Sequence, residues 1–325
     1  MAPGFDEYTR SFSKHIDAAA AAHLAAQLSD FAGVRLDEMD AAGIDFAILS
    51  QAAPSVQAES DASIALAKAK RANDFLAEKI ATRADRFGGF ATLPMQDPKA
   101  AACEMERCAC EFGLLGALVN GQTGGVYYDD PAFDVFWETM QSLDVPLYLH
   151  PANLFSVPAM YRDYPVIEGA VWGWGVETAT HALRLLFGGV FDRFPKLKVI
   201  LGHMGETLPY LRWRFDSRFS VYTHGVKLAR KPSEYIGSNI LITTSGVCSD
   251  AALMGAIGEV GIDAVMFSVD YPYESIPVAA DWIDAAPISE TARAAICHGN
   301  AERVFRLPPG GSKSATGSRR STATV

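Results

Sequence analysis

The stretch AVMFSVD, Ala264–Asp270, joins an apolar run to a carboxylate at its end. Val, Met and Phe favour a buried strand, whereas Asp270 places a charge where that strand stops. A buried charge is costly unless it is paired or bound to a metal. Asp270 therefore either caps the turn formed with the following Tyr-Pro-Tyr or belongs to a functional site.

The same pattern recurs along the chain. Continuous apolar runs, each preceded by a segment of helical character, predict strands at Ile44–Ser50, Phe87–Leu93, Leu114–Asn120, Val145–His150, Leu197–His203, Asn239–Gly246 and Ala264–Asp270. Continuous rather than alternating apolar strands are typical of a parallel sheet that is buried on both faces. The fold class predicted is α/β, a TIM (β/α)8 barrel, which needs eight strands. Residues 1–18 contain no candidate for the eighth, so either the fold is not a barrel or its first strand is missing from this chain.

Polar residues gather at the ends of these predicted strands. Asn120, His150, His203 and Asp270 each stand at or near the carboxyl end of one. Barrel enzymes build their active sites at that face from several strands. A lone histidine on an apolar run is more often a structural residue, but four such residues in one repeating architecture indicate a site. Two imidazoles and a carboxylate suit a divalent metal.

Composition limits the remaining possibilities. With 325 residues, 49% of them hydrophobic, the chain can form one barrel domain over residues 1–307. The last segment, 308–325, is rich in Gly, Ser and Thr and is predicted to be a disordered tail. The net charge of -10 and the lack of a basic cluster in the domain argue against nucleic acid. No apolar run could span a membrane and no leader is evident, so a cytoplasmic location with reduced cysteines is expected.

Several longer stretches carry a family resemblance. DRFGGFATLPMQDP, YYDDPAFDVFW, LDVPLYLHP, GVFDRFPKLKVILGHMGE and FSVDYPYE resemble the metal-dependent decarboxylases of the amidohydrolase superfamily. The chain looks most similar to the hydroxybenzoate decarboxylases that act on γ-resorcylate (2,6-dihydroxybenzoate), 2,3-dihydroxybenzoate and salicylate. The resemblance covers most of the residues from Arg35 to Leu307.

The resemblance implies a metal site. It makes His150 and Asp270 ligands of one divalent ion, which is zinc, manganese or magnesium in various members. It places His203 near the metal, paired with Glu206. The alternative roles are structural: His203 could cap the helix that follows it, and Glu206 could be a first-turn acid that interacts favourably with the helix dipole.

The resemblance also implies a substrate pocket for a small aromatic carboxylic acid. Arg214 matches an arginine that the family uses near the substrate, and Asn120 and Trp174 would line the ring pocket. Trp174 departs from the family's usual phenylalanine. Arg214 could instead be an exposed helix residue or an ion-pair partner of Asp216 or Glu206, and Asn120 could serve a turn.

One feature of the family does not appear in this sequence. Members begin with a strand ending in Glu-x-His, which supplies further metal ligands, and Met1 stands just after the place where that motif is expected. The predicted activity is release of CO2 by protonation of the carboxylate-bearing ring carbon, in a homodimer or homotetramer. The alternatives are a metal-dependent hydrolase or hydratase of the same superfamily, or an inactive truncated paralogue.

Overall fold

The computed structural model describes residues 1–3, 5, 17–308 and 321–324. Its strands are β1 (Ile44–Leu49), β2 (Phe87–Gly89), β3 (Ala91–Thr92), β4 (Ala117–Asn120), β5 (Leu147–His150), β6 (Val199–Leu201), β7 (Ile240–Thr243), β8 (Val265–Met266) and β9 (Ser321–Thr324). All seven strand regions predicted from the apolar runs are present, which confirms the α/β prediction. Continuous apolar runs gave this result because these strands are covered on both faces.

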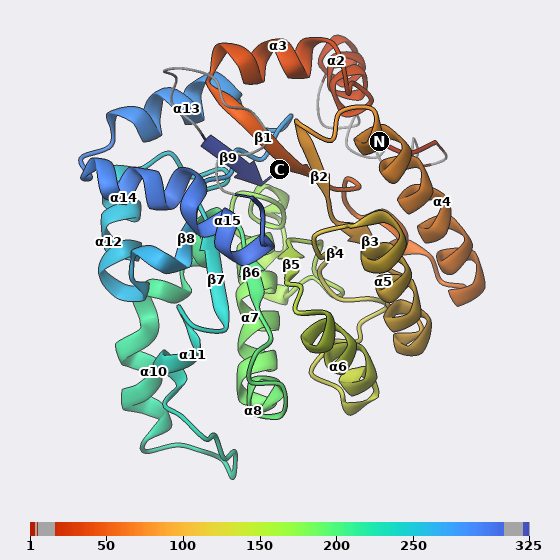
Figure 1. The fold of residues 1–325 in the computed structure, drawn as a ribbon. Coiled ribbons are helices and arrows are strands. Elements are labelled where there is room, and N and C mark those ends of the chain that lie inside the picture. Colours follow the sequence, from red (N-terminus) through yellow and green to blue (C-terminus); the bar gives the residue numbers. More distant parts are fainter. Residues whose placement is uncertain (4, 6–16, 309–320, 325) are drawn as a thin grey trace.

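The strands pair in parallel in chain order. One sheet runs β3-β4-β5-β6-β7-β8 and the other β2-β1-β9. The two sheets meet at Phe90, where the strand breaks but its backbone amide still donates to the Leu49 carbonyl at 2.8 Å. Figure 1 shows the strands arranged around a centre with helices outside them. Among the described residues, no ladder of hydrogen bonds joins β8 to β9.

Helices connect the strands and cover the barrel. The α-helices are α2 (Ala18–Leu28), α3 (Val34–Ala41), α4 (Ala62–Ala81), α5 (Pro98–Phe112), α6 (Asp134–Leu143), α7 (Gly173–Phe187), α8 (Val190–Arg193), α9 (His203–Glu206), α10 (Arg212–Phe219), α11 (Pro232–Tyr235), α12 (Asp250–Val260), α13 (Ile276–Ala285), α14 (Glu290–Ala294) and α15 (Asn300–Phe305). Local chemistry sets their starts: the Asp97 carboxylate caps α5 by accepting from the amides of Lys99 and Ala100. The shorter turns are η2 (Ser55–Ala58), η3 (Pro131–Phe133), η4 (Ala159–Tyr161), η5 (Pro165–Ile167), η6 (Leu208–Leu211), η7 (Ile262–Ala264) and the π-helical η8 (Ala295–Gly299).

The barrel interior is filled by one residue from each of the seven strand regions predicted from the sequence. These residues form one buried cluster, which consists of Ile48, Phe90, Leu118, Tyr148, Ile200, Leu241 and Met266 with Ala264, Ala301 and Phe305. Phe305, at the end of α15, packs on Phe90 with ring centroids 5.6 Å apart. Because side chains alternate along a strand, the residue two places after each interior position also faces inward. The period of two thus carries Asn120 and His150 onto the interior face, above Leu118 and Tyr148.

A segment from the end of the chain occupies the strand position beside β1. The described residues before β1 form α2 and α3 and no strand, so the first strand of a barrel is not found there. Instead Ser321–Thr324 lie parallel to β1, and Figure 1 shows β9 between β1 and β8. The predicted disordered tail falls mostly on residues 309–320 and 325, outside the described part, but these four residues are a strand. An edge strand such as β1 is a template for strand addition, and β9 pairs with it here.

The cysteines and the helices were compared with the expectations from composition. All five cysteines lie in the described part of the chain and are free thiols. Within that part, no helix is both long and apolar enough to cross a bilayer.

Candidate active site

Four predicted residues lie at the carboxyl ends of the strands. Asn120 and His150 end β4 and β5 and are direct neighbours in the ladder. His203 follows β6, and Asp270 follows β8. The rings of His150 and His203 are 6.5 Å apart between centroids. Parallel strands bring their carboxyl ends to one face, so residues far apart in sequence meet there.

A strained turn holds His203 and its acid. His203 Nδ1 and Glu206 Oε1 are 2.6 Å apart, and Glu206 is buried. Each residue from His203 to Thr207 has a positive φ, between 46° and 77°. A left-handed conformation costs about 1–2 kcal/mol for each residue that has a Cβ atom. Such strain is typical of functional sites, where the surrounding structure enforces it.

Asp270 is the second carboxylate beside His203. His203 Nε2 lies 3.6 Å from Asp270 Oδ2, so the imidazole stands between two carboxylates. Burial by itself would lower the pKa of His203, but Asp270 and Glu206 outweigh it and raise that pKa to about 10. Burial alone would raise the pKa of Asp270, yet the contact with His203 holds it below its usual value. At neutral pH the proton therefore resides on His203, and Asp270 is charged. Asp270 also has a positive φ of 80°.

The pKa of His150 is shifted in the opposite direction from that of His203. Burial is the main cause that lowers its pKa, and the nearby charge on His203 adds to it. Its Nδ1 lies 2.9 Å from the Pro151 carbonyl, which acts as acceptor and fixes the proton on that nitrogen. The lone pair of Nε2 is then free to bind a ligand. A neutral imidazole with Nδ1 held by a backbone carbonyl is the usual form of a metal-binding histidine.

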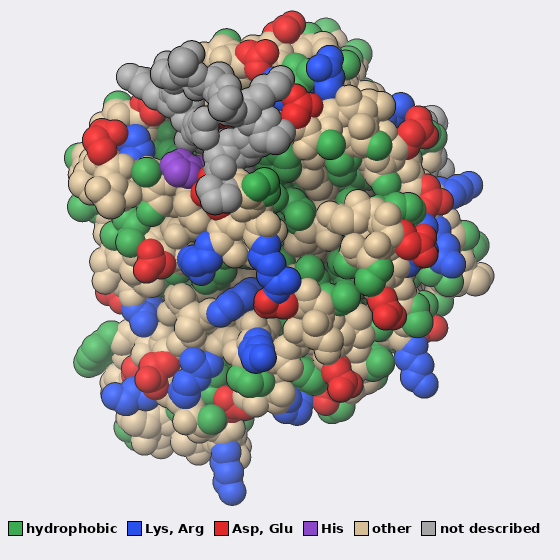
Figure 2. All heavy atoms as spheres, viewed as in Figure 1, with side chains coloured by type: hydrophobic (Ala, Val, Ile, Leu, Met, Phe, Trp, Pro, Cys, Tyr) green, Lys and Arg blue, Asp and Glu red, His purple; other side chains and the backbone are tan. Residues whose placement is uncertain are grey.

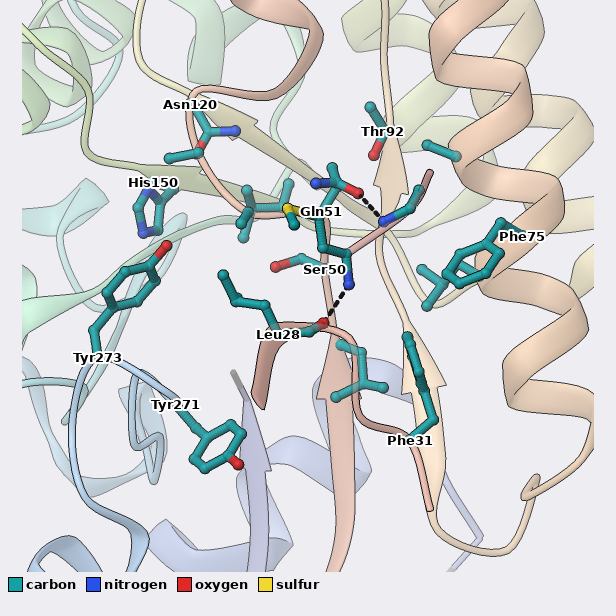
Figure 3. Close-up of a pocket in the computed structure, with 18 of the residues that line it drawn as sticks. Leu28, Phe31, Ser50, Gln51, Phe75, Thr92, Asn120, His150, Tyr271 and Tyr273 are labelled. Atoms are coloured by element: carbon teal, nitrogen blue, oxygen red, sulfur yellow. Dashed lines mark hydrogen bonds between the residues drawn. The ribbon is translucent and has the colours of Figure 1, made fainter. Parts of the chain in front are cut away.

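These residues open into a pocket of about 70 Å³. It is lined by His150, Asp270, Asn120 and Gln51, together with residues of α2, α4 and the Tyr271–Tyr273 loop. Two buried polar atoms in it have no partner among the described residues, Asn120 Oδ1 and Gln51 Nε2. Figure 3 shows the Tyr273 hydroxyl directed toward His150. One orphaned acceptor and one orphaned donor in one pocket are suited to a polar ligand.

The donor set accommodates a divalent metal in part. His150 Nε2 and the Asp270 carboxylate are a nitrogen and an oxygen ligand that suit zinc or manganese. Within the described residues, however, no group of three His, Cys, Asp or Glu side chains is placed to hold an ion. His203 is engaged with Glu206 and carries a proton, so it does not act as a third ligand. Other ligands must be oxygens of water or substrate, or residues outside the described part.

Two predicted residues lie away from the pocket lining. Arg214 is exposed on α10. Trp174, in the first turn of α7, donates from its indole to Asn153 Oδ1 at 2.8 Å and so ties α7 to the loop after β5. The structure therefore brings together Asn120, His150, His203, Glu206 and Asp270, and does not bring Arg214 and Trp174 to the same place.

One buried acid was not foreseen. Glu177 on α7 is buried, and its carboxylate lies beside Tyr127 and the backbone of Gln122. Burial is the largest of the causes that raise its pKa to about 7, and the charge of Glu206 adds to it. Its Oε2 would lie 3.2 Å from a Cβ atom at Gly121, directly after Asn120. The sequence signal is a helical spacing of four that puts Glu177 and the buried His181 on the same apolar face.

Comparison with known proteins identifies the family. The amidohydrolase family matches residues 18–307. The chain belongs to this family. It is 47% identical over 293 residues to the gamma-resorcylate decarboxylase of Polaromonas sp. strain JS666, covering 87% of this chain and 90% of the relative. It is 46% identical over 294 residues to that of Rhizobium radiobacter, covering 86% and 89%.

Solved structures of this amidohydrolase group agree. A 2,6-dihydroxybenzoate decarboxylase complexed with 2,6-dihydroxybenzoate has a TM-score of 0.87 and 44% identity, covering 90% of this chain and 93% of that one. A dihydroxybenzoic acid decarboxylase from Polaromonas sp. JS666, with bound manganese and 2-nitroresorcinol, has a TM-score of 0.88 and 45% identity, covering 93% of both chains. The predicted family, the barrel fold and the enzyme class, carboxy-lyase, are thereby confirmed.

Proposed function

We propose that this amidohydrolase is a metal-dependent, non-oxidative decarboxylase of a hydroxybenzoate. The observation that carries the proposal is the imidazolium of His203, held 2.6 Å from Glu206 and 3.6 Å from Asp270 at the strand ends that also bear His150. Decarboxylation of an aromatic acid needs one proton at the ring carbon, and this cluster stores one. The named relatives act on dihydroxybenzoates, which supports the same substrate class here.

His150 and Asp270 would hold the metal, which would be zinc, manganese or magnesium. When bound, a divalent ion supplies Lewis acidity and a template for neighbouring substrate oxygens. The chain's own contribution is orientation: the Pro151 carbonyl fixes the His150 tautomer, and Glu206 accepts from Nδ1 of His203 and orients its ring.

The proton movement can be written in full. His203 Nε2 passes its proton to the Asp270 carboxylate, which delivers it to the ring carbon that bears the carboxylate. The bond to the carboxylate then breaks, its electron pair restores the aromatic ring, and CO2 leaves. A proton from solvent then returns to His203, which restores the starting state.

The pocket supplies binding groups for the acid. Asn120 Oδ1 can accept from a ring hydroxyl, and Gln51 Nε2 can donate to a carboxylate oxygen, because both are buried and unpartnered among the described residues. Arg214 and Trp174 remain proposals for substrate binding, by resemblance alone. Arg214 is exposed, so in this role it would need a movement of α10 or a contact with substrate outside the pocket.

We further propose a homodimer or homotetramer in the cytoplasm. The segment between β5 and α7 exposes an unusual number of large apolar side chains, which include Phe155, Val157, Met160, Tyr164, Val166, Val171 and Trp172. Exposed apolar surface of this kind is typical of an interface between protein chains. The molar mass from sedimentation equilibrium tests it, and a monomer at micromolar concentration would rule it out.

The deciding experiment measures metal content and CO2 release together. Zinc, manganese and magnesium are supplied in turn with 2,6-dihydroxybenzoate, 2,3-dihydroxybenzoate and salicylate. We expect one metal ion per chain and CO2 in amounts equal to the phenol formed. Bound metal without CO2 from any of the acids would favour a hydrolase or hydratase. Absence of both would favour the inactive paralogue.

A further inference from the structure

A second cleft lies at the opposite end of the barrel from the active site. It has a volume of about 100 Å³ and is lined by the end of α6, the residues before β5 and β6, and α15. Its charged lining residues are Lys196, Lys198, Arg303, Arg306 and Asp144. Four cations thus face one carboxylate, in a protein with a net charge of -10. Figure 2 shows blue side chains gathered on the face where α15 lies.

The cations in this cleft have mostly neutral partners. Lys198 Nζ donates to the Ser238 carbonyl at 2.6 Å. Arg303 Nη2 donates to the Asp263 carbonyl at 2.5 Å, so the backbone of Asp263 and not its carboxylate is the partner. Of the four cations that line the cleft, only Arg306 forms an ion pair within the described part of the chain, and its partner is Asp144. The carboxylate in the cleft is thereby already engaged.

The charges of the group repel one another. Lys198 is half-buried, and burial is the main cause that lowers its pKa, with the charges of Arg303 and Arg230 next. Arg230 in turn donates to neutral oxygens of Ser238 and Asn239. A positive charge is disfavoured here because no carboxylate compensates it. An anion placed among these side chains would relieve the repulsion and receive charge-assisted hydrogen bonds.

We propose that this cleft, the basic cleft of Lys196, Lys198, Arg303 and Arg306, binds a small multivalent oxyanion of the phosphate type. The volume is enough to hold a single tetrahedral oxyanion. Lysine and arginine are the side chains that bind phosphate oxygens most readily. The site is separate from the proposed chemistry, because Lys198 precedes β6 and His203 follows it.

The test uses inorganic phosphate as the probe, with the metal-loaded protein at constant ionic strength. Isothermal titration calorimetry should show saturable binding of one phosphate per chain. Lys198→Met and Arg303→Gln should each weaken that binding about tenfold or more, as expected for loss of one charge-assisted contact. Lys70→Met removes an exposed lysine from α4, far from the cleft in sequence, and should leave the binding unchanged.

A second comparison separates the cleft from the catalytic metal, which could itself bind phosphate. Asp270→Asn should retain phosphate binding if the anion occupies the basic cleft. Loss of binding in Asp270→Asn but not in Arg303→Gln would overturn the proposal, as would equal, non-saturable binding in all variants. If Lys198→Met fails to fold, the exposed pair Lys196→Gln and Arg303→Gln carries the test. None of these results depends on whether the enzyme releases CO2.

Discussion

Strand β6 has cations at both ends, and the two ends compensate them differently. At its carboxyl end, the charged His203 stands between Glu206 and Asp270. Before its amino end, Lys196 and Lys198 share a cleft with two arginines and one carboxylate that is already paired. At the carboxyl end of β6, side chains of the same protein neutralise the positive charge. At the amino end, an excess of positive charge remains.

This difference shows what each end is built to do. A histidine fixed between acids keeps its proton and can pass it on in a defined direction, which is useful for a reaction that consumes one proton. Cations with only carbonyl and amide partners have no internal counter-ion, so their natural partner comes from solution. The predictions below change the charge at one end or the other.

The largest effect is expected from Asp270→Asn. The substitution removes the proposed acid and one metal ligand, and it takes away one of the two charges that face His203. A general acid contributes ~10²–10⁴-fold to a rate, and loss of a ligand adds to that, so turnover should fall below detection. Steady-state CO2 release is the measurement, with Asp281→Asn on the exposed side of α13 as the matched control. Near-normal activity in Asp270→Asn would refute the mechanism.

Glu206→Gln should have a smaller but characteristic effect. The amide still reaches His203 Nδ1 but no longer stabilises its charge, so the pKa of His203 should fall from about 10. Because the folded pKa of His203 is raised, its contribution to stability is full below its unfolded value near 6.5 and is lost as pH rises toward 10. That alkaline loss should be smaller and complete at a lower pH in the variant.

The measurement for Glu206→Gln is the pH profile of kcat/KM together with the imidazole signals of His203 by NMR. We expect a rate lower by about 10–100-fold at pH 7, as for other carboxylates that orient a histidine. The alkaline limb should also move to lower pH. A lower rate with an unchanged alkaline limb would show that Glu206 only holds the turn in place.

The strands and part of the candidate site could be predicted from the sequence, and the turn after β6 could not. The strands were predictable because burial on both faces leaves a continuous apolar run, as in the stretch before His150. The meeting of His150, His203 and Asp270 was predictable because parallel strands end at one face. The pairing of His203 with Glu206 came only from resemblance. A left-handed turn over five residues, of which only Gly205 is glycine, has no signal in local propensity.

Other features depended on contacts between distant segments. The pairing of Ser321–Thr324 with β1 depends on a free sheet edge that is visible only in three dimensions. The basic cleft joins residues near 144, 197 and 304, which no window of sequence contains together. Arg214, which was matched by resemblance, is exposed on α10 and is not among the residues that line the pocket, so its role stays a prediction.

Glu177→Gln tests the buried acid that lies next to Gly121, just after the carboxyl end of β4. Its folded pKa is raised to about 7 from 4.5, so the proton is retained on folding between these values. Stability is therefore lost as pH rises from about 4.5 to 7, by on the order of 3 kcal/mol for a shift of this size. The neutral amide should remove this dependence and make the variant more stable than the parent at pH 8. Urea unfolding at pH 5 and pH 8 measures it, and parallel pH dependences in the two proteins would contradict the assignment of a neutral Glu177.

The smallest effect is expected at the amino end, from Lys196→Gln. Lys196 is exposed, and the described structure pairs only its backbone amide, with Gln141 Oε1. Removing its charge relieves repulsion from Lys198 and the arginines without breaking a side-chain contact. The thermal midpoint should rise by about one degree or less at low salt and in the absence of oxyanions, and this gain should vanish at high salt, where the Debye length is only ~3 Å at 1 M. Lys70→Gln should show no such gain. If Lys196→Gln lowers the midpoint at low salt, the lysine is compensated in the free protein, and the contrast between the two ends of β6 is lost.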